Sequence, residues 1–211
     1  YFHLGWKASF LRFTQSTAIV EARGPRMLPL QGYGEPKADV RVYRVDPLHA
    51  GLWPFPSSPI VVDEQSAPPF PGEEPTTPDI PGAIDSQSLQ KHLRLLGSPL
   101  VSRLVDLPLA DKANTTTFGL DLKPLVDQRP GTYLVGLRRL TGRSERAYVR
   151  VQITNLTMTS VEETDKAVLY VRTLDTGDAV RGSTVRLEGT YATSPRLAVE
   201  EFTTDGEGGV V

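Results

Sequence analysis

The chain has 211 residues, of which 39% are apolar and 23% charged, and a formal net charge of −2. This composition is typical of a globular protein, and its lack of excess positive charge excludes a nucleic acid or an anionic membrane surface as the expected partner. No apolar run reaches the roughly 20 residues of a membrane-spanning helix, so we expect no membrane span in this piece. The chain contains no cysteine, which removes disulfides, thiolate metal sites and a cysteine nucleophile.

Strand-like segments dominate the first three quarters of the chain. Seven of them precede residue 155, the number expected of a β-sandwich: 5–13, 17–23, 38–46, 101–107, 116–122, 132–140 and 147–154. The last one alternates cleanly, so we expect Val149 and Val151 in a core while Tyr148 and Arg150 face water. Gly142-Arg143-Ser144 is expected to be the turn of a hairpin between the last two segments.

Proline interrupts this pattern in the middle of the chain. Residues 54–82 include nine prolines, which predicts an insertion that runs over the surface, without a core-forming strand, and from which 57–80 could be removed. The preceding Trp53 and the Phe55 within it suit either packing on the domain itself or anchoring a partner. A short helix is predicted over 86–96, with Asp85 or Ser86 at its start and Gly97 at its end.

After residue 155 the strand pattern restarts with LTMTSVE, AVLYVRTL, STVRLEG and RLAVEEFTT. We therefore predict two domains, a β-sandwich over 1–153 and the first part of a second, truncated β-sandwich over 154–211. The turn at Asp175-Thr176-Gly177 is expected to join two strands of one sheet. The start at Tyr1 without methionine indicates a piece cut from a longer protein.

No residue pattern predicts catalysis. His3, His49 and His92 lack metal-ligand spacing, and neither a Gly-x-Ser-x-Gly motif nor a Ser, His and Asp set stands out. Gly32-Tyr33-Gly34 is interpreted as a turn and not a phosphate loop, and Asp205-Gly206-Glu207-Gly208 as a glycine hairpin and not a calcium loop. We therefore predict no enzyme and no catalytic, cofactor-binding or metal-binding residue.

The stretch from Val151 to Gly189 resembles the junction between consecutive macroglobulin-type domains of bacterial alpha-2-macroglobulins. The matching residues are Thr154-Asn155-Leu156, Leu174-Asp175-Thr176-Gly177 and Gly182-Ser183-Thr184-Val185-Arg186-Leu187. Pro130-Gly131-Thr132-Tyr133, the segment Arg41–Leu48 and the turn at 203–210 are similar to further strands and turns of such domains. The fold class that this resemblance implies is all-β, with immunoglobulin- or fibronectin-like macroglobulin-type β-sandwiches, one short helix and the Pro-rich insertion.

The resemblance also implies a function. It points to a non-catalytic module of a large protein in the bacterial periplasm, which inhibits or traps proteases or protects the envelope through protein–protein contacts. The implied partners are target proteases and envelope proteins such as those of peptidoglycan synthesis, and membrane association would come through a segment not present here. The family's thioester, which needs a cysteine, lies outside this piece or is missing from the parent, and the Pro-rich insertion favours the class that lacks it. The alternatives are a bead of a bacterial surface adhesin and an accessory β-domain of a secreted enzyme.

Overall fold

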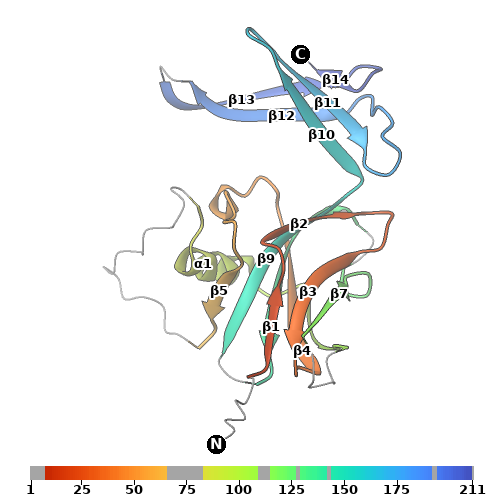
Figure 1. The fold of residues 1–211 in the computed structure, drawn as a ribbon. Coiled ribbons are helices and arrows are strands. Elements are labelled where there is room, and N and C mark those ends of the chain that lie inside the picture. The colour runs from red at the N-terminus through yellow and green to blue at the C-terminus, as the bar shows by residue number, and fades with distance from the viewer. Residues whose placement is uncertain are drawn as a thin grey trace, which may run out of the picture. The chain divides into compact units, whose positions relative to one another are not determined.

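The computed structural model describes residues 8–65, 83–108, 115–126, 129–141, 144–191 and 194–210. The chain forms two compact units, Tyr1–Ile153 and Thr154–Val211. Apart from one short α-helix and a 3-10 turn, the elements of the described residues are β-strands (Figure 1). The predicted all-β fold class with a short helix is confirmed.

Unit 1 is a sandwich of two sheets. Its elements are β1 (Phe10–Phe13), β2 (Thr17–Glu21), β3 (Met27–Tyr33), β4 (Lys37–Val45), η1 (Ala50–Leu52), β5 (Ile60–Asp63), α1 (Ser86–Leu96), β6 (Val101–Asp106), β7 (Thr116–Asp121), β8 (Gly131–Arg139) and β9 (Glu145–Thr154). The smaller sheet has the order β1-β3-β7, and the larger one the order β2-β9-β8-β4-β6, with β5 also paired to β9. Strands β8 and β9 form the predicted hairpin, although Gly142 and Arg143 at its tip lie outside the described residues.

The main core lies between the two sheets. Alternate residues of β4, β8 and β9 fill it, including Val40, Val135, Val149 and Val151, and each of these is at most 1% exposed. This is the face that the alternation of residues 147–154 predicts to be buried. Leu28 and Leu30 contribute from the facing sheet, through β3, which is not among the strands predicted from the sequence.

A second core covers the opposite face of the larger sheet. Helix α1 buries Leu89 and Leu93 against Tyr43, Leu134 and Tyr148 from β4, β8 and β9. Tyr148 was expected to face water but is 1% exposed, because the helix covers the face to which it belongs. The larger sheet is therefore buried on both sides over much of its area, with different alternate residues in each core.

Local signals in the sequence fix the ends of α1. The Asp85 side chain accepts a hydrogen bond from the backbone N–H of Ser88 at 2.7 Å, which satisfies one of the free donors of the first turn. Gly97 ends the helix with a positive φ of 75° and donates its N–H to the carbonyl of Arg94. The predicted helix and both of its caps are thus present.

The start of the Pro-rich stretch belongs to the fold. Residues 66–82 lie outside the described residues, but β5 pairs with β9 and places Ile60 and Val62 in the second core, with Phe55 beside them. The expectation that residues 57–80 contribute no core is therefore wrong. The strand fits between Pro59 and the later prolines because an edge strand pairs on one side only.

Unit 2 consists of a three-stranded sheet and a hairpin. Its strands are β10 (Leu156–Glu162), β11 (Ala167–Thr173), β12 (Thr184–Tyr191), β13 (Ser194–Thr203) and β14 (Gly209–Val210), with the sheet order β10-β11-β14 and the separate pair β12-β13. The strands on either side of the Asp175-Thr176-Gly177 turn thus belong to different sheets, which corrects the expectation that they build one. After this turn only the bridge between Arg172 and Ala179 continues the pairing before the chain crosses over.

Gly208 provides a test of the tight turn before β14. Its φ is +75°, and a Cβ at this position would lie 2.5 Å from the carbonyl oxygen of Val171. We expect Gly208→Ala to destabilise unit 2 by at least about 1–2 kcal/mol, the cost of the left-handed conformation alone. Faster hydrogen exchange at the Val171 amide, which donates to the Gly208 carbonyl, would report the change. Gly206→Ala is the matched control, because a Cβ at Gly206 meets no atom within 4 Å.

Candidate functional site

Two of the three histidines come together although they lie far apart in the sequence. The rings of His49, in the turn after β4, and His92, on α1, are edge to face with centroids 5.1 Å apart. The Nδ1 atom of each ring is buried and has no hydrogen-bond partner among the described residues. Gly51 makes room for the pair, since a Cβ there would lie 2.2 Å from Cε1 of His92. His3 lies outside the described residues.

The pair predicts an acid-sensitive contribution to the stability of unit 1. Burial, with the nearby His49 and Lys91, lowers the pKa of His92 below its usual value of 6.5. The unfolded chain therefore binds the proton first, and the free energy of unfolding falls as the pH decreases from about 6.5 through the lowered pKa. Chemical denaturation at several pH values should show this fall in the unmutated chain and not in the His92→Gln variant. Parallel pH profiles for the two proteins would contradict the prediction.

The Trp-Pro-Phe-Pro stretch packs on its own domain. Phe55 is buried in the second core. Trp53 donates its indole N–H to the Pro47 carbonyl at 2.8 Å, and the guanidinium carbon of Arg150 lies 3.6 Å from the centroid of the indole ring. Trp53 still exposes 46% of its surface, so self-packing fixes the indole without hiding it.

The two glycine motifs are parts of turns and strands. Gly32 and Tyr33 belong to β3, and the predicted turn is at Gly34, where φ is +67°. In the motif at 205–208, Oδ1 of Asp205 accepts hydrogen bonds from the backbone N–H groups of Glu207 and Gly209, at 2.9 and 2.8 Å. The carboxylate thus closes a tight turn. The expected hairpin is wrong, because the strands on either side, β13 and β14, belong to different sheets.

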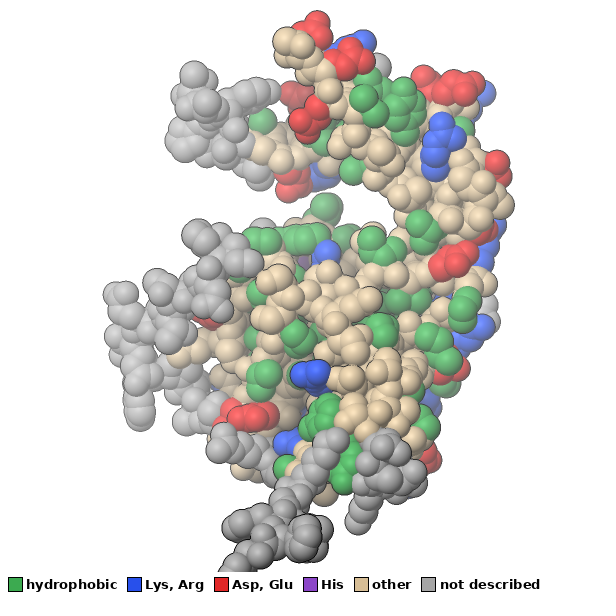
Figure 2. All heavy atoms as spheres, in the orientation of Figure 1, with side chains coloured by type: hydrophobic (Ala, Val, Ile, Leu, Met, Phe, Trp, Pro, Cys, Tyr) green, Lys and Arg blue, Asp and Glu red, His purple; other side chains and the backbone are tan. Residues whose placement is uncertain are grey.

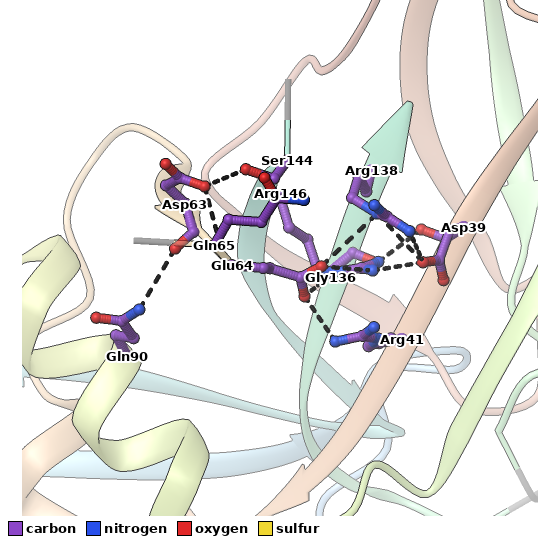
Figure 3. Close-up of polar contacts among 10 residues, drawn as sticks. All are labelled: Asp39, Arg41, Asp63, Glu64, Gln65, Gln90, Gly136, Arg138, Ser144 and Arg146. Carbon is purple, nitrogen blue, oxygen red and sulfur yellow. Dashed lines mark hydrogen bonds and ion pairs between the residues drawn. The ribbon is translucent and has the colours of Figure 1, made fainter. Parts of the chain in front are cut away.

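The most developed polar arrangement in the described residues is a cluster of charged side chains around Arg146 (Figure 3). Arg146 is completely buried, on β9. Its Nε lies 2.8 Å from Oε1 of Glu64, one Nη 2.6 Å from Oδ2 of Asp39, and the other 2.7 Å from the Asp39 carbonyl. Arg138 donates to Asp39 at 2.9 Å, and Arg41 donates to Glu64 at 2.6 Å. We call these five side chains the Arg146 cluster.

The charges of the Arg146 cluster depend on one another. Burial alone would raise the pKa of Asp39, but hydrogen bonds from Arg146 and Arg138 and the nearby charge of Arg41 hold that pKa below its ordinary value. Burial likewise would lower the pKa of Arg146, and its bonds to Glu64 and Asp39 raise it instead. The Asp39 carboxylate thus stays ionised because guanidinium groups satisfy it.

The cluster attaches the end of β5 to the larger sheet. Asp39 and Arg41 come from β4, Arg138 from β8 and Arg146 from β9, while Glu64 directly follows β5. Gly136 on β8 leaves space for the stem of Arg146, because a Cβ there would lie 2.6 Å from its Cδ. Both carboxylates of the cluster are paired with arginines. The cluster therefore fits a structural role, and neither carboxylate is available for acid–base chemistry.

The described residues show neither a candidate metal site nor a candidate membrane-spanning helix. Within them, no group of three or more His, Asp or Glu side chains is arranged to hold a metal ion. No helix in the described part of the chain is long and apolar enough to cross a membrane.

Comparisons with solved structures define the class of fold. A fragment of Escherichia coli alpha-2-macroglobulin that spans domains NIE and MG1 superposes with a TM-score of 0.63 and 17% identity, over 96% of this chain and 85% of that one. A longer E. coli fragment, MG0-NIE-MG1, gives 0.59 and 15%, over 96% of this chain and 56% of that one. A Salmonella alpha-2-macroglobulin gives 0.55 and 12%, over 97% of this chain and 10% of that one. No family model and no curated protein matches the sequence.

The chain is therefore structurally similar to the N-terminal domains of bacterial alpha-2-macroglobulins, and its fold is of the macroglobulin-domain type. At 12 to 17% identity this likeness concerns the fold alone. The chain spans about a tenth of the Salmonella protein.

Proposed function

We propose that this chain is a non-catalytic module of a large bacterial alpha-2-macroglobulin-like protein that inhibits or traps proteases. The observation that carries the proposal is the match of both units, in order, to the E. coli fragment, over 96% of the chain. The Arg146 cluster and the two cores of unit 1 suit a rigid scaffold that positions other parts of the parent. The order of domains in the E. coli fragment supports assigning unit 1 to NIE and unit 2 to the first part of MG1.

The proposal extends to compartment and partners. The parent would work in the periplasm, and its partners would be target proteases together with proteins of the envelope. We place it in the class without a thioester. The charge balance of the chain, −2 overall, supports protein partners over nucleic acid.

Exposure of the full-length parent to trypsin tests the proposed activity. One E. coli relative is described as trypsin activated. A trapping protein should leave bound trypsin active on a small chromogenic peptide and block its activity on a large protein substrate, because the trap excludes large substrates sterically. Trypsin that digests both substrates unhindered would overturn the proposal and favour the surface-adhesin alternative.

The intact mass of the parent with and without methylamine tests the thioester assignment separately. A Salmonella relative is described as reacted with methylamine. We expect no change in mass, since the proposed class lacks the thioester that the amine would open. A gain of one methylamine would move the parent to the thioester-containing class and leave the trapping proposal in place.

A further inference from the structure

The edge of β1 is open in the described part of the chain. Thr14 donates its N–H to the carbonyl of Pro29 on β3, and the register pairs Arg12 with Gln31 two residues earlier. Hydrogen-bonded pairs alternate along an antiparallel ladder, so the backbone N–H and C=O groups of Leu11 and Phe13 point away from β3. No other strand of the described residues pairs with that side of β1. At Ser9 the same side is already used, because Arg139 donates to its carbonyl at 2.6 Å.

The neighbouring edge, on β5, is closed by comparison. Glu64 donates its N–H to the Ser144 carbonyl, which places the outward-facing carbonyls of β5 at Val61 and Asp63. Both are taken by α1: the Ser86 hydroxyl donates to Val61 at 2.6 Å, and the Gln90 amide donates to Asp63 at 3.3 Å. Helix α1 therefore covers the edge of β5, while in the described residues the edge of β1 stays open as a template for another strand.

A groove of about 550 Å³ separates these two edges. Leu11 and Phe13 line it on one side, and Pro59, Val61 and Ala147 on the other. Val61 is 48% exposed and lies opposite Ala147 in the ladder between β5 and β9. The face of the molecule that carries β1 and β5 is turned toward the viewer in Figure 2, where hydrophobic side chains lie among a few charged ones. A strand placed beside β1 would cover this apolar margin of the main core.

The positive charge of Arg12 at the groove indicates which side chains an incoming strand would carry. Arg12 lines the groove and makes its hydrogen bonds to the neutral Gln31 amide, at 2.6 and 3.1 Å. No carboxylate of the described residues pairs with this guanidinium. A carboxylate on the incoming strand, opposite Arg12, would complement it.

We propose that an extended segment of a partner protein adds to β1 as a fourth strand of the smaller sheet. Its backbone bonds the free groups of Leu11 and Phe13, its inward side chains are aliphatic and cover Val61 and Ala147, and one outward side chain is acidic and pairs with Arg12. Backbone bonds supply affinity in this mode of recognition, and alternate side chains supply selectivity. The site rests on the geometry of unit 1 and does not depend on the proposed protease trapping.

A blocked, fluorescein-labelled nonapeptide of alternating valine and threonine, with one central glutamate, is the probe. We expect saturable binding to the protein by fluorescence anisotropy, and slower hydrogen–deuterium exchange in the segment that contains Leu11 and Phe13. Val61→Arg should weaken binding at least tenfold without changing the melting temperature. Ile19→Arg is the matched control, because Ile19 on β2 is 70% exposed and lies outside the groove. This variant should bind the peptide as tightly as the unmutated chain does.

Charge exchange tests the role of Arg12. The Arg12→Glu variant should bind the glutamate peptide several-fold more weakly than the unmutated chain does. It should bind a second peptide, in which lysine replaces that glutamate, better than the unmutated chain does. The proposal would be overturned if the unmutated chain and the Val61→Arg variant bound the peptide equally well, or if neither bound it. A sedimentation profile of a dimer that Val61→Arg dissociates would overturn it as well, since a second copy would then occupy the groove. Protection of the Leu11 and Phe13 amides in a peptide-free monomer would also overturn it.

Discussion

Replacement of Arg146 by alanine is expected to cost unit 1 about 3–5 kcal/mol, because it leaves two carboxylates without their central partner. Asp39 and Glu64 each have a short contact to this guanidinium, at 2.6 and 2.8 Å, and the Asp39 side chain is only 9% exposed. Without Arg146, the two carboxylates keep only their contacts to Arg138 and Arg41, and the attachment of β5 at Glu64 is weakened. Urea denaturation followed by tryptophan fluorescence reports on unit 1 alone, since Trp6 and Trp53 both belong to it.

A control separates this effect from the loss of any arginine. Arg103 is exposed on β6, so Arg103→Ala should change the free energy of unfolding by at most about 0.5 kcal/mol. If Arg146→Ala and Arg103→Ala had equally small effects, the cluster would be dispensable for stability. A hydrophobic replacement of similar length, Arg146→Met, should remain destabilising, because it too removes the guanidinium that Asp39 and Glu64 share and leaves them only their contacts to Arg138 and Arg41.

Val151→Asp is expected to unfold unit 1. Val151 is fully buried in the main core between the two sheets, where a carboxylate would find neither water nor a partner. We expect a loss of about 4–5 kcal/mol or more, which is comparable to the whole stability of many domains. The tryptophan unfolding transition should disappear or move to much lower temperature.

The neighbouring residue supplies the comparison for this substitution. Gln152 is exposed on the same strand, so Gln152→Asp adds the same carboxylate one position further along, on the face that alternation places outside the main core. It should leave the melting temperature nearly unchanged. A normal transition for Val151→Asp would mean that the face assigned to the main core is wrong.

The alternation of residues 147–154 was enough to predict which side of β9 lies between the sheets. It did not reveal that the other side is also covered, because Tyr148 has the half-polar character of a surface position as well as of a core one. The coverage comes from α1, which ends at Leu96, far before β9 begins at Glu145. The start and end of α1 could be predicted from the sequence, because the capping residues Asp85 and Gly97 bond to backbone groups only three residues away.

The Arg146 cluster could not be predicted from the sequence. Arg146 and Asp39 are 107 residues apart, and a charged residue that alternates with apolar ones normally indicates a face toward water. Strand β5 was hidden for a different reason, because the prolines around it outweighed a run of only four residues, Ile60–Asp63. Its apolar residues between Pro59 and Asp63 were the available signal.

Strand β9 ends at Thr154 and β10 begins at Leu156, so a single residue, Asn155, lies between these two strands. A tensile force applied to this end of β9, parallel to the strand, would act along the axis of β9. There the perpendicular hydrogen bonds to β8, which pair Gly131 through Leu137 with β9, would bear the load together and not one after another. A force in this direction would therefore have to shear the pairing of β9 with β8 before unit 1 could unravel.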